Sequence, residues 1–283
     1  MNNIHKETLI ELAIREDQGS GDHTSLACIP ANATNIAELR IKSNGILAGI
    51  AVAKTVFNKL MPGASIDWLM KDGDAIAPGN VAFTIEGNTQ KLLQAERLVL
   101  NFMQRMSGIA TLTATYVSKV EGLGTKILDT RKTTPGLRHF EKEAVQIGGG
   151  FNHRIGLYDM MMIKDNHIDY AGGIKEAIEG AVVYQKEKGL KIPIEVEARD
   201  LNEVEQILET ESIDRIMLDN FSYEDTRKAV NLIAGRCETE SSGGINLDTV
   251  RPYAECGVDF ISVGALTHQI KSLDMSLKAI KQK

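Results

Sequence analysis

The sequence predicts an α/β protein in two parts, a mixed α/β region followed by a parallel α/β barrel. In the first hundred or so residues, strand-like pieces follow a helical apolar pattern at residues 4–15 and precede a long helical pattern over residues 90–117. After about residue 116, strands alternate with amphipathic helices. That alternation is typical of a parallel sheet whose outer face is covered by helices.

The first region contains short apolar runs separated by Gly- and Pro-containing turns, which indicate strands. These runs are residues 36–43, 45–53, 65–70 and 81–87. In the long helix that follows, Leu92, Val99, Met103 and Met106 lie near one stripe. Arg97, Asn101 and Gln104, at positions i, i+4 and i+7, lie on another face of the same helix. The pattern therefore predicts that the first domain ends inside this helix.

The second region contains six predicted strands at the interval of a repeated βα unit. They are residues 126–130, 158–165, 192–198, 215–220, 237–242 and 260–264. Asp200 with Glu203, and Ser222 with Asp225, resemble capping boxes and predict where two of the helices begin. Six such units in series favour a barrel over an open sheet, although a conventional barrel closes with more strands.

The bulk composition indicates an ordinary globular protein of 283 residues with a net charge of −6. An acidic chain is a poor candidate for non-specific binding to nucleic acid or a membrane surface, and we expect neither. No apolar run approaches the length of a membrane span. The three cysteines are odd in number and widely separated, and the N-terminus lacks the pattern of a signal peptide. We therefore expect free thiols and a cytoplasmic protein.

Positive charge is concentrated in one part of this acidic chain. Between Lys126 and Lys164 there are seven Lys/Arg against four Asp/Glu, a local net charge of +3. Such a cationic segment suggests a small anionic ligand.

The predicted strand ends carry charges or glycine turns, and in α/β barrels the working residues lie at the carboxyl ends of strands. In chain order these ends are Thr130, Arg131 and Lys132, then Lys164, Glu197 and Asp219, then Ser242, Gly243 and Gly244, and finally Gly264 and Ala265. Any one of them alone is best interpreted as a solvated loop. As a set they are segregated, with cations on the early strands, carboxylates on the middle ones and glycines on the last two.

Each group has more than one chemical interpretation. The glycine turns suit either a phosphate or a tight βα connection. The cations Arg131, Lys132, His153, Arg154 and Lys164 could surround an anion or form ordinary ion pairs, and Lys132 or Lys164 could form a Schiff base. Glu197 and Asp219 could hydrogen-bond sugar hydroxyls, act as a base, or hold a Mg²⁺ that takes most of its ligands from phosphate and water.

Seven motifs resemble the family of nicotinate-nucleotide pyrophosphorylases, also called quinolinate phosphoribosyltransferases. They are EDQGSGDHTS, AERLVLNFMQRMSGIAT, LDTRKTTPGLR, GGGFNHRIGLYDMMMIKDNHI, IEVEA, IMLDN and ESSGGI. The resemblance implies an N-terminal α/β sandwich domain, residues 1–115, and an incomplete, seven-stranded-type α/β barrel, residues 116–269. A C-terminal helix over residues 270–283 is expected to pack back on the first domain.

The resemblance also implies a reaction, a cofactor and an assembly. The family transfers phosphoribosyl from phosphoribosyl pyrophosphate (PRPP) to quinolinate with Mg²⁺, giving nicotinate mononucleotide, pyrophosphate and CO₂ for NAD biosynthesis. The expected enzyme is a homodimer, or a larger oligomer of dimers, in which Arg97 reaches the partner's site.

Family roles transfer residue by residue onto the matching motifs. The expected substrate-binding residues are Arg97, Thr130, Arg131, Lys132, Arg138, His153, Arg154, Lys164, Glu197, Asp219, Ser242, Gly243, Gly244, Gly264 and Ala265. Among these, Lys132, Glu197 and Asp219 are the expected catalytic residues, and the two carboxylates are also expected at the Mg²⁺. The quinolinate pocket would be lined by Arg131, His153, Arg154 and Lys164.

Three rival interpretations remain open. One is a related phosphoribosyltransferase-like protein acting on another aromatic acid, such as the paralogue associated with molybdate-transport operons. Another is a Schiff-base aldolase or decarboxylase on the same barrel, working through Lys132 or Lys164. The third is a module that binds phosphosugars without catalysis.

Overall fold

The structure, a computed structural model, describes residues 2–210 and 212–280, and the chain divides into two compact units. The first unit comprises Met1–Ala114, Thr134–Gly149 and Gln269–Lys283, and the second comprises Thr115–Thr133 and Gly150–His268. The segment Thr134–Gly149 thus interrupts the second unit in sequence but belongs to the first. The simpler division at residues 115/116 and 269/270 stays a prediction.

The first unit is built on a four-stranded antiparallel sheet with the strand order β12-β1-β5-β3, plus a two-stranded ladder of β2 and β4. Its elements are α1 (Asn2–Gln18), α2 (His23–Cys28), β1 (Thr34–Ile41), β2 (Gly45–Ile46), α3 (Ile50–Leu60), β3 (Ser65–Trp68), β4 (Ala75–Ile76), β5 (Val81–Asn88), α4 (Thr89–Lys119), α5 (Arg138–Ile147) and β12 (Met275–Ala279). Helix α4 is the long helix that the sequence predicts, and it continues past the end of this unit.

Aromatic side chains join α3 to the sheet of the first unit. Phe83 of β5 is fully buried and meets Phe57 of α3 edge-on at 5.6 Å between ring centroids. Trp68 of β3 also packs against the Phe83 ring, at 4.9 Å between ring centroids. Burying large rings in one cluster supplies much of the apolar area that holds a helix against a sheet.

Two sequence predictions in the first unit are wrong. The apolar run 45–53 reads as a strand, but only Gly45–Ile46 is extended and Ile50–Leu60 is helix α3. The helical period becomes visible only when the exposed Lys54, Asn58 and Lys59 are included. The predicted C-terminal helix 270–283 is instead strand β12 over Met275–Ala279, with residues 281–283 outside the described part. Pairing with β1, far away in sequence, overrides the local pattern there.

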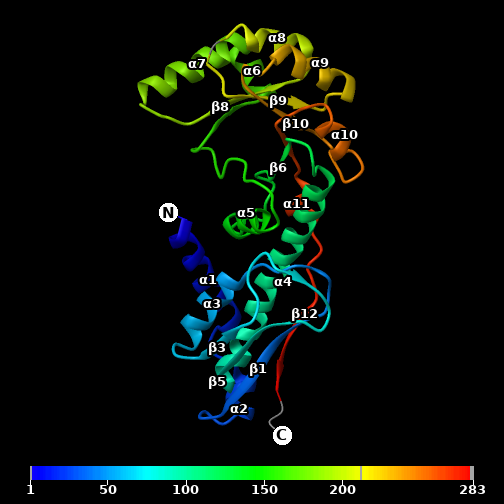
Figure 1. The fold of residues 1–283 in the computed structure, drawn as a ribbon. Helices are drawn as coiled ribbons and strands as arrows, with labels where there is room; N and C mark the ends of the chain where they lie inside the picture. Colours follow the sequence, from blue (N-terminus) through cyan, green and yellow to red (C-terminus); the bar gives the residue numbers. More distant parts are fainter. Residues whose placement is uncertain (1, 211, 281–283) are drawn as a thin grey trace. The chain divides into compact units, whose positions relative to one another are not determined.

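The second unit contains a six-stranded parallel sheet with the order β6-β11-β10-β9-β8-β7. Its elements are β6 (Lys126–Leu128), β7 (Met161–Ile163), α6 (Asp165–Ala171), α7 (Ile174–Glu187), β8 (Ile194–Ala198), α8 (Leu201–Leu208), β9 (Arg215–Asp219), α9 (Tyr223–Ile233), β10 (Glu238–Ser242), α10 (Val250–Ala254), β11 (Phe260–Ser262) and α11 (Ala265–His268). Helices α7, α8 and α9 cover one face of this sheet (Figure 1).

All six predicted barrel strands are present, and a parallel bridge between Leu128 and Phe151 adds a seventh extended position beside β6. The predicted α/β class with an incomplete parallel barrel is confirmed. The two predicted capping sites are also confirmed, because the Asp200 side chain accepts from the backbone N–H of Glu203 and Ser222 accepts from that of Asp225.

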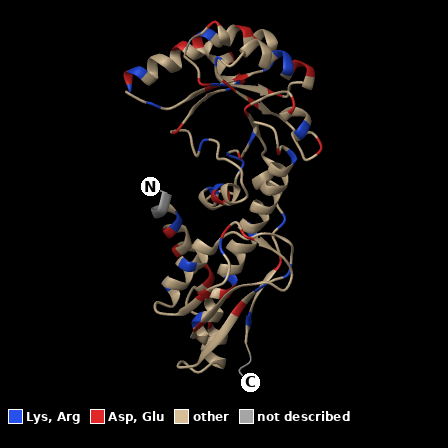
Figure 2. Ribbon diagram, in the orientation of Figure 1, with Lys and Arg blue, Asp and Glu red and all other residues tan. Residues whose placement is uncertain are grey.

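The outer helices of the second unit carry residues of both charge signs along their length (Figure 2). Some form ion pairs one helical turn apart, as Lys175 does with Glu179 on α7 and Lys228 with Glu224 on α9. In residues 2–210 and 212–280, no helix has the length and apolar character that crossing a bilayer requires. Cys28, Cys237 and Cys256 are free thiols, as predicted.

Candidate active site at the carboxyl ends of the barrel strands

The loop after β6 holds Thr130, Arg131 and Lys132 in a fixed backbone conformation. The hydroxyl of Thr130 accepts a hydrogen bond from the backbone N–H of Lys132 at 3.0 Å. The carbonyl of Lys132 accepts one from the hydroxyl of Thr267, on α11, at 2.7 Å. The Lys132 side chain passes Gly264, where a Cβ would lie only 3.0 Å from its Cδ. The first and last strand ends of the barrel therefore meet at Lys132.

Arg154 lies beside this loop, in the segment that follows the bridge at Phe151. Its side chain donates from Nη1 to the carbonyl of Met160 at 3.2 Å, and the residue is 9% exposed. Burial, followed by the positive charge of Arg131, lowers the pKa of Arg154. Within the described part of the chain, Arg154 Nε is buried and has no hydrogen-bond partner. Two neighbouring guanidinium groups, one of them with a buried donor that lacks a partner among the described residues, form a site suited to an anion.

Lys164 and Glu197 end neighbouring strands, β7 and β8, and contact each other. Lys164 Nζ lies 3.0 Å from Glu197 Oε2. The lysine is about half exposed, whereas Glu197 is 8% exposed. The carboxylate therefore serves as the buried end of a partly open ion pair, and the lysine keeps donors available for a ligand.

Asp219 ends β9, next to the strand of Glu197. Its Oδ2 accepts from the Asn220 side chain at 2.7 Å. One oxygen of Glu197 and one of Asp219 are thus engaged with Lys164 and Asn220, and each carboxylate has a second oxygen to offer. Two oxygen donors on adjacent strands are the chemistry that Mg²⁺ prefers, but they are too few for a cage made by protein alone. They fit an ion that takes its other ligands from phosphate and water.

The turn after β10 brings backbone close to Asn220. The Asn220 N–H donates to the carbonyl of Ser242 at 2.9 Å. Gly243 has a φ of +98°, and a Cβ there would lie 2.8 Å from Asn220 N, so a side chain does not fit. At Gly244, with φ of +61°, a Cβ would have no heavy atom within 4 Å. The turn therefore leaves open space directly beside exposed backbone, which suits a phosphate group.

Gly264 and Ala265 lie at the end of the last strand, β11, where Ala265 begins α11. Arg97 and Arg138 lie in the first unit, Arg97 exposed on α4 and Arg138 at the start of α5. The remaining candidate residues all belong to the second unit and lie at or just after the carboxyl ends of its strands, or after the Phe151 bridge. Their roles toward a ligand stay predictions.

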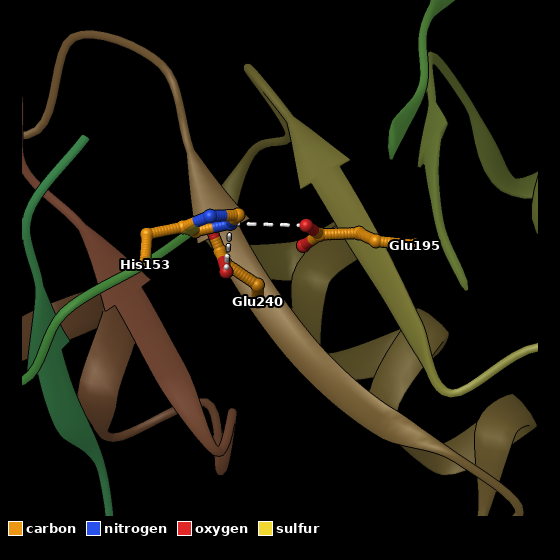
Figure 3. A group of neighbouring side chains, drawn as sticks. All are labelled: His153, Glu195 and Glu240. Carbon is orange, nitrogen blue, oxygen red and sulfur yellow. Dashed lines mark ion pairs between the residues drawn. The ribbon is translucent and has the colours of Figure 1, made fainter. Parts of the chain in front are cut away.

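His153 lies inside the barrel, 7% exposed, with its imidazole directed at two carboxylates (Figure 3). Its Nε2 is 2.9 Å from Glu195 Oε2 and 3.4 Å from Glu240 Oε2. Its backbone N–H donates to the fully buried Asp129 at 2.8 Å. Sequence reasoning singled out His153 but missed Glu195 and Glu240. For Glu195 the available signal was a charged residue in the otherwise mostly apolar strand IEVEA, where carboxylates are rare unless paired. Strand β10, ETESS, is polar throughout and offered no such signal for Glu240.

Hydrogen bonds and charge decide the protonation of this cluster. Burial opposes a charged imidazole at His153, but the hydrogen bonds to Glu195 and Glu240 outweigh it and raise the pKa of His153 to about 9. Burial, and then the charge of Glu240, raises the pKa of Glu195 to about 7. The cluster therefore retains a proton near neutral pH. The backbone N–H of Arg154 donates to Nδ1 at 2.7 Å, which requires an unprotonated Nδ1. The raised pKa therefore describes the proton that Nε2 shares with Glu195, 2.9 Å away, and not a doubly protonated ring.

The fold and these residues define a class, the α/β-barrel proteins that bind anionic ligands at the carboxyl ends of their strands. The chain belongs to the quinolinate phosphoribosyltransferase family. The family's N-terminal domain matches residues 22–107 and its C-terminal domain matches residues 109–278. The predicted family membership and the two-domain fold are confirmed.

Named relatives and solved structures agree with this membership. The chain is 47% identical to the chloroplastic nicotinate-nucleotide pyrophosphorylase [carboxylating] of Arabidopsis thaliana, over 96% of this chain and 82% of that protein. It is 42% identical to the probable nicotinate-nucleotide pyrophosphorylase [carboxylating] of Bacillus subtilis, over 98% and 94% respectively. The crystal structure of NadC from Streptococcus pyogenes superposes with a TM-score of 0.91 at 39% identity, covering 97% of this chain and 96% of that one.

The comparisons contradict the prediction of a cytoplasmic protein. The Arabidopsis thaliana relative is named chloroplastic, and a Nicotiana tabacum relative at 45% identity is named mitochondrial. The prediction was wrong because it rested on the cysteines and on the lack of a signal-peptide pattern or membrane span, and these properties do not distinguish one reducing compartment from another.

Proposed function

We propose that the protein is a quinolinate phosphoribosyltransferase, a pentosyltransferase that joins quinolinate to PRPP with loss of CO₂ and forms nicotinate mononucleotide and pyrophosphate. The observation that carries the proposal is that two positive guanidinium groups, Arg131 and Arg154, lie close enough to repel each other. The buried Nε of Arg154 also lacks a partner among the described residues. Quinolinate has two adjacent carboxylates and PRPP carries several phosphate charges, so the site must bring together two anions that repel each other.

The cations bind quinolinate and place its ring nitrogen. Arg131 and Arg154 present forked donors that match carboxylates, and Lys164 adds a point charge at the end of β7. One ion pair at about 4 Å contributes on the order of 4 kcal/mol at an effective dielectric near 20, before desolvation. Several cations are therefore needed to hold a dianion beside a polyphosphate. Thr130, Arg138 and His153 complete the proposed quinolinate side.

The carboxylates and the glycine turns bind the donor. Glu197 and Asp219 accept hydrogen bonds from the ribose hydroxyls, and the same two carboxylates would help to hold the Mg²⁺ that accompanies the pyrophosphate. Mg²⁺, when bound, neutralises the pyrophosphate and makes it a better leaving group. The 5′-phosphate binds the backbone of the last two strand ends. Its proposed contacts are Ser242, Gly243, Gly244, Gly264 and Ala265.

Transfer and decarboxylation use the same cations in turn. The quinolinate nitrogen attacks the anomeric carbon as the C–O bond to pyrophosphate breaks, and Lys132 lies between the two substrates to stabilise the charge that moves. The ring nitrogen is then positive, so the C2–carboxylate bond breaks and leaves its electron pair on C2 as CO₂ departs. Cations near C2 stabilise that carbanion until it takes a proton. A rigid strand end keeps these side chains in position throughout.

The proposed enzyme is a homodimer, or an oligomer built from dimers. Arg97, exposed on α4, contributes to the partner's site, so that each site is complete only in the assembly.

An assay with quinolinate, PRPP and Mg²⁺ tests the proposal, with nicotinate as the control that has a single carboxylate. Release of CO₂ from carboxyl-labelled quinolinate and formation of nicotinate mononucleotide are expected, with little turnover of nicotinate. A preference for nicotinate would overturn the substrate assignment. Turnover without Mg²⁺ would show that the reaction does not require the metal.

A further inference from the structure

The carboxylates of Glu195 and Glu240 form an ionisable cluster with His153 beneath the candidate site (Figure 3). Glu195, on β8, and Glu240, on β10, are both 0% exposed. Arg215, at the start of β9, donates from Nη1 to Glu240 at 2.9 Å. The proposed function does not use these three residues.

Such a cluster needs an explanation beyond stability. Burying carboxylates is costly, and apolar residues of similar volume often stabilise a barrel core as well or better. Both carboxylate oxygens of Glu195 are buried, and Oε2 lies 2.9 Å from His153 Nε2. The cluster is therefore organised around one imidazole ring.

A metal centre is one possible organisation, because one ligand atom from each of His153, Glu195 and Glu240 lies within 4.8 Å of the others. The orientation of the imidazole argues against it. A metal at this position needs the lone pair of Nε2, but the lone pair of Nδ1 already accepts the Arg154 N–H at 2.7 Å. A neutral imidazole with an unprotonated Nδ1 carries its proton on Nε2. That proton faces the carboxylates, so the carboxylates hold the ring.

The held ring in turn fixes the backbone of Arg154. His153 is bound on both sides of its own peptide, by its N–H to Asp129 Oδ1 and by its Nδ1 to the N–H of Arg154. Rotating the ring away from Glu195 breaks the bond at Nδ1. The backbone from which the Arg154 guanidinium projects would then lose one of its two anchors.

We infer that Glu195 and Glu240 are positioning residues that act through the His153 imidazole to hold Arg154 in place for an anionic carboxylate ligand. Glu195 makes the shorter contact and carries the larger share. The identity of the ligand rests on the proposed function, whereas the chain of contacts from Glu195 through the imidazole to Arg154 does not.

Steady-state kinetics of purified full-length variants test the inference. Glu195→Leu removes the acceptor, Glu195→Gln keeps an oxygen that accepts from Nε2, and Glu240→Gln probes the longer contact. Glu238→Gln is the matched control, because Glu238 also forms an ion pair with Arg215. Its side chain is 53% exposed and, among the described residues, does not contact His153. Glu195→Leu is expected to raise the KM for quinolinate about tenfold or more. The KM for PRPP should change by less than about twofold.

The glutamine variant separates positioning from other roles. Glu195→Gln is expected to restore most of the quinolinate affinity, and Glu238→Gln to behave as the wild type. Equal increases in both KM values together with a large fall in the melting temperature would indicate a structural role and overturn the inference. So would an unchanged KM for quinolinate in a folded Glu195→Leu. Stoichiometric binding of Zn²⁺ or Mn²⁺ that Glu195→Gln abolishes would establish a metal site instead.

Nitrogen-15 NMR of the histidine side chains gives a readout independent of turnover. In the wild type, His153 Nδ1 should show the shift of an acceptor nitrogen and Nε2 that of a protonated one, and Glu195→Gln should preserve this pattern. If the wild type turns over no quinolinate, the proposed function fails. The spectrum still tests the contacts from Glu195 through His153 to Arg154, because it does not depend on turnover. A protonated Nδ1 in the wild type at neutral pH would overturn the inference whatever the substrate. If Glu195→Leu does not fold, the glutamine variants and the wild-type spectrum still decide.

Discussion

Lys164 Nζ lies 3.0 Å from Glu197 Oε2, and this contact joins the cationic strand ends of the barrel to its acidic ones. Because the lysine is about half exposed, the pair contributes little stability, about 1 kcal/mol or less. Its value lies in holding one cation and one carboxylate at a fixed separation. Lys164 then faces the quinolinate side of the proposed site and Glu197 the ribose side.

Lys164→Met should therefore weaken quinolinate binding while leaving the fold intact. We expect an increase in the KM for quinolinate of about tenfold or more. The free energy of unfolding should change by less than about 1 kcal/mol. Initial-rate kinetics and urea denaturation of the same preparation check both values. Lys175→Met, at an exposed ion pair on α7, is the control and should alter neither. If Lys164→Met and Lys175→Met have the same kinetics, Lys164 does not contribute to the site.

Lys132→Ala tests whether the protein is a catalyst or only binds phosphosugars. Lys132 is fixed through its backbone and its side chain is exposed, so its removal leaves the packing unchanged. We expect kcat to fall by about 10² to 10³, the usual loss when one preorganised charge is removed from a transition state. PRPP binding by calorimetry should persist. Borohydride trapping of the wild type with substrate checks the Schiff-base alternative, and a covalent adduct at Lys132 would favour it.

Gly243→Ala should destabilise the turn after β10. The added Cβ would lie 2.8 Å from Asn220 N, and the positive φ at Gly243 disfavours any side chain. We expect a loss of roughly 2 to 4 kcal/mol in the free energy of unfolding, from the combination of backbone strain and overpacking. Urea denaturation measures it. Gly244→Ala is the matched control, because its Cβ meets open space, and it should cost only about 1 to 2 kcal/mol.

The same pair of variants separates stability from phosphate binding. An alanine at position 244 would occupy the space that we assign to the 5′-phosphate. Gly244→Ala should therefore raise the KM for PRPP more than its small effect on stability accounts for. An unchanged KM for PRPP would indicate that the 5′-phosphate does not bind at this turn.

The sequence predicts the second unit well because its strands and helices are specified by residues that are neighbours in the sequence. Near-continuous apolar strands separated by capped helices specify parallel βα units, and in such a sheet all carboxyl ends lie at one edge. That rule alone brings Lys132, Lys164, Glu197 and Asp219 to the same side of the barrel. The prediction does not require knowing which side chains touch.

The failures concern contacts between residues far apart in sequence. Residues 275–279 become strand β12 because β1 offers a free edge more than two hundred residues earlier. Glu195 and Glu240 were missed because their significance depends on His153, and nothing in the pattern of either strand identifies that partner. The run 45–53 was misread because a short apolar segment fits a strand as well as a buried helix.

His139 gives a prediction about pH and stability. Burial, and then the positive charges of His5, Lys6 and Arg138, lower the pKa of His139 in the folded protein. The ring stacks on His5 at 5.6 Å, and Lys6 pairs with Glu143 nearby. Because the unfolded chain binds a proton more readily at this position, the stability contributed by neutral His139 is present above a pH of about 6.5 and is lost as pH falls below it.

Comparison with His139→Gln isolates this contribution from other titrating groups. The wild type should lose more of its free energy of unfolding than the variant between pH 7 and pH 5, measured by urea denaturation at each pH. His268→Gln, at an exposed histidine, serves as the control and should follow the wild type. A variant with the same pH dependence as the wild type would contradict the lowered pKa.

The proposed dimer predicts a result that a monomeric enzyme would not give. If Arg97 completes the partner's site, Arg97→Ala and Arg131→Ala homodimers should both be nearly inactive, each lacking one cation at every site. In a mixed dimer, one site receives Arg131 from its own chain and Arg97 from its partner, while the other site lacks both. Denaturing and refolding an equal mixture gives about half mixed dimers by random pairing, each with one intact site. Activity should then recover to about a quarter of the wild-type value per subunit. Subunit exchange measured with differently tagged chains is the control, because full exchange with no recovery would place Arg97 outside the partner's site.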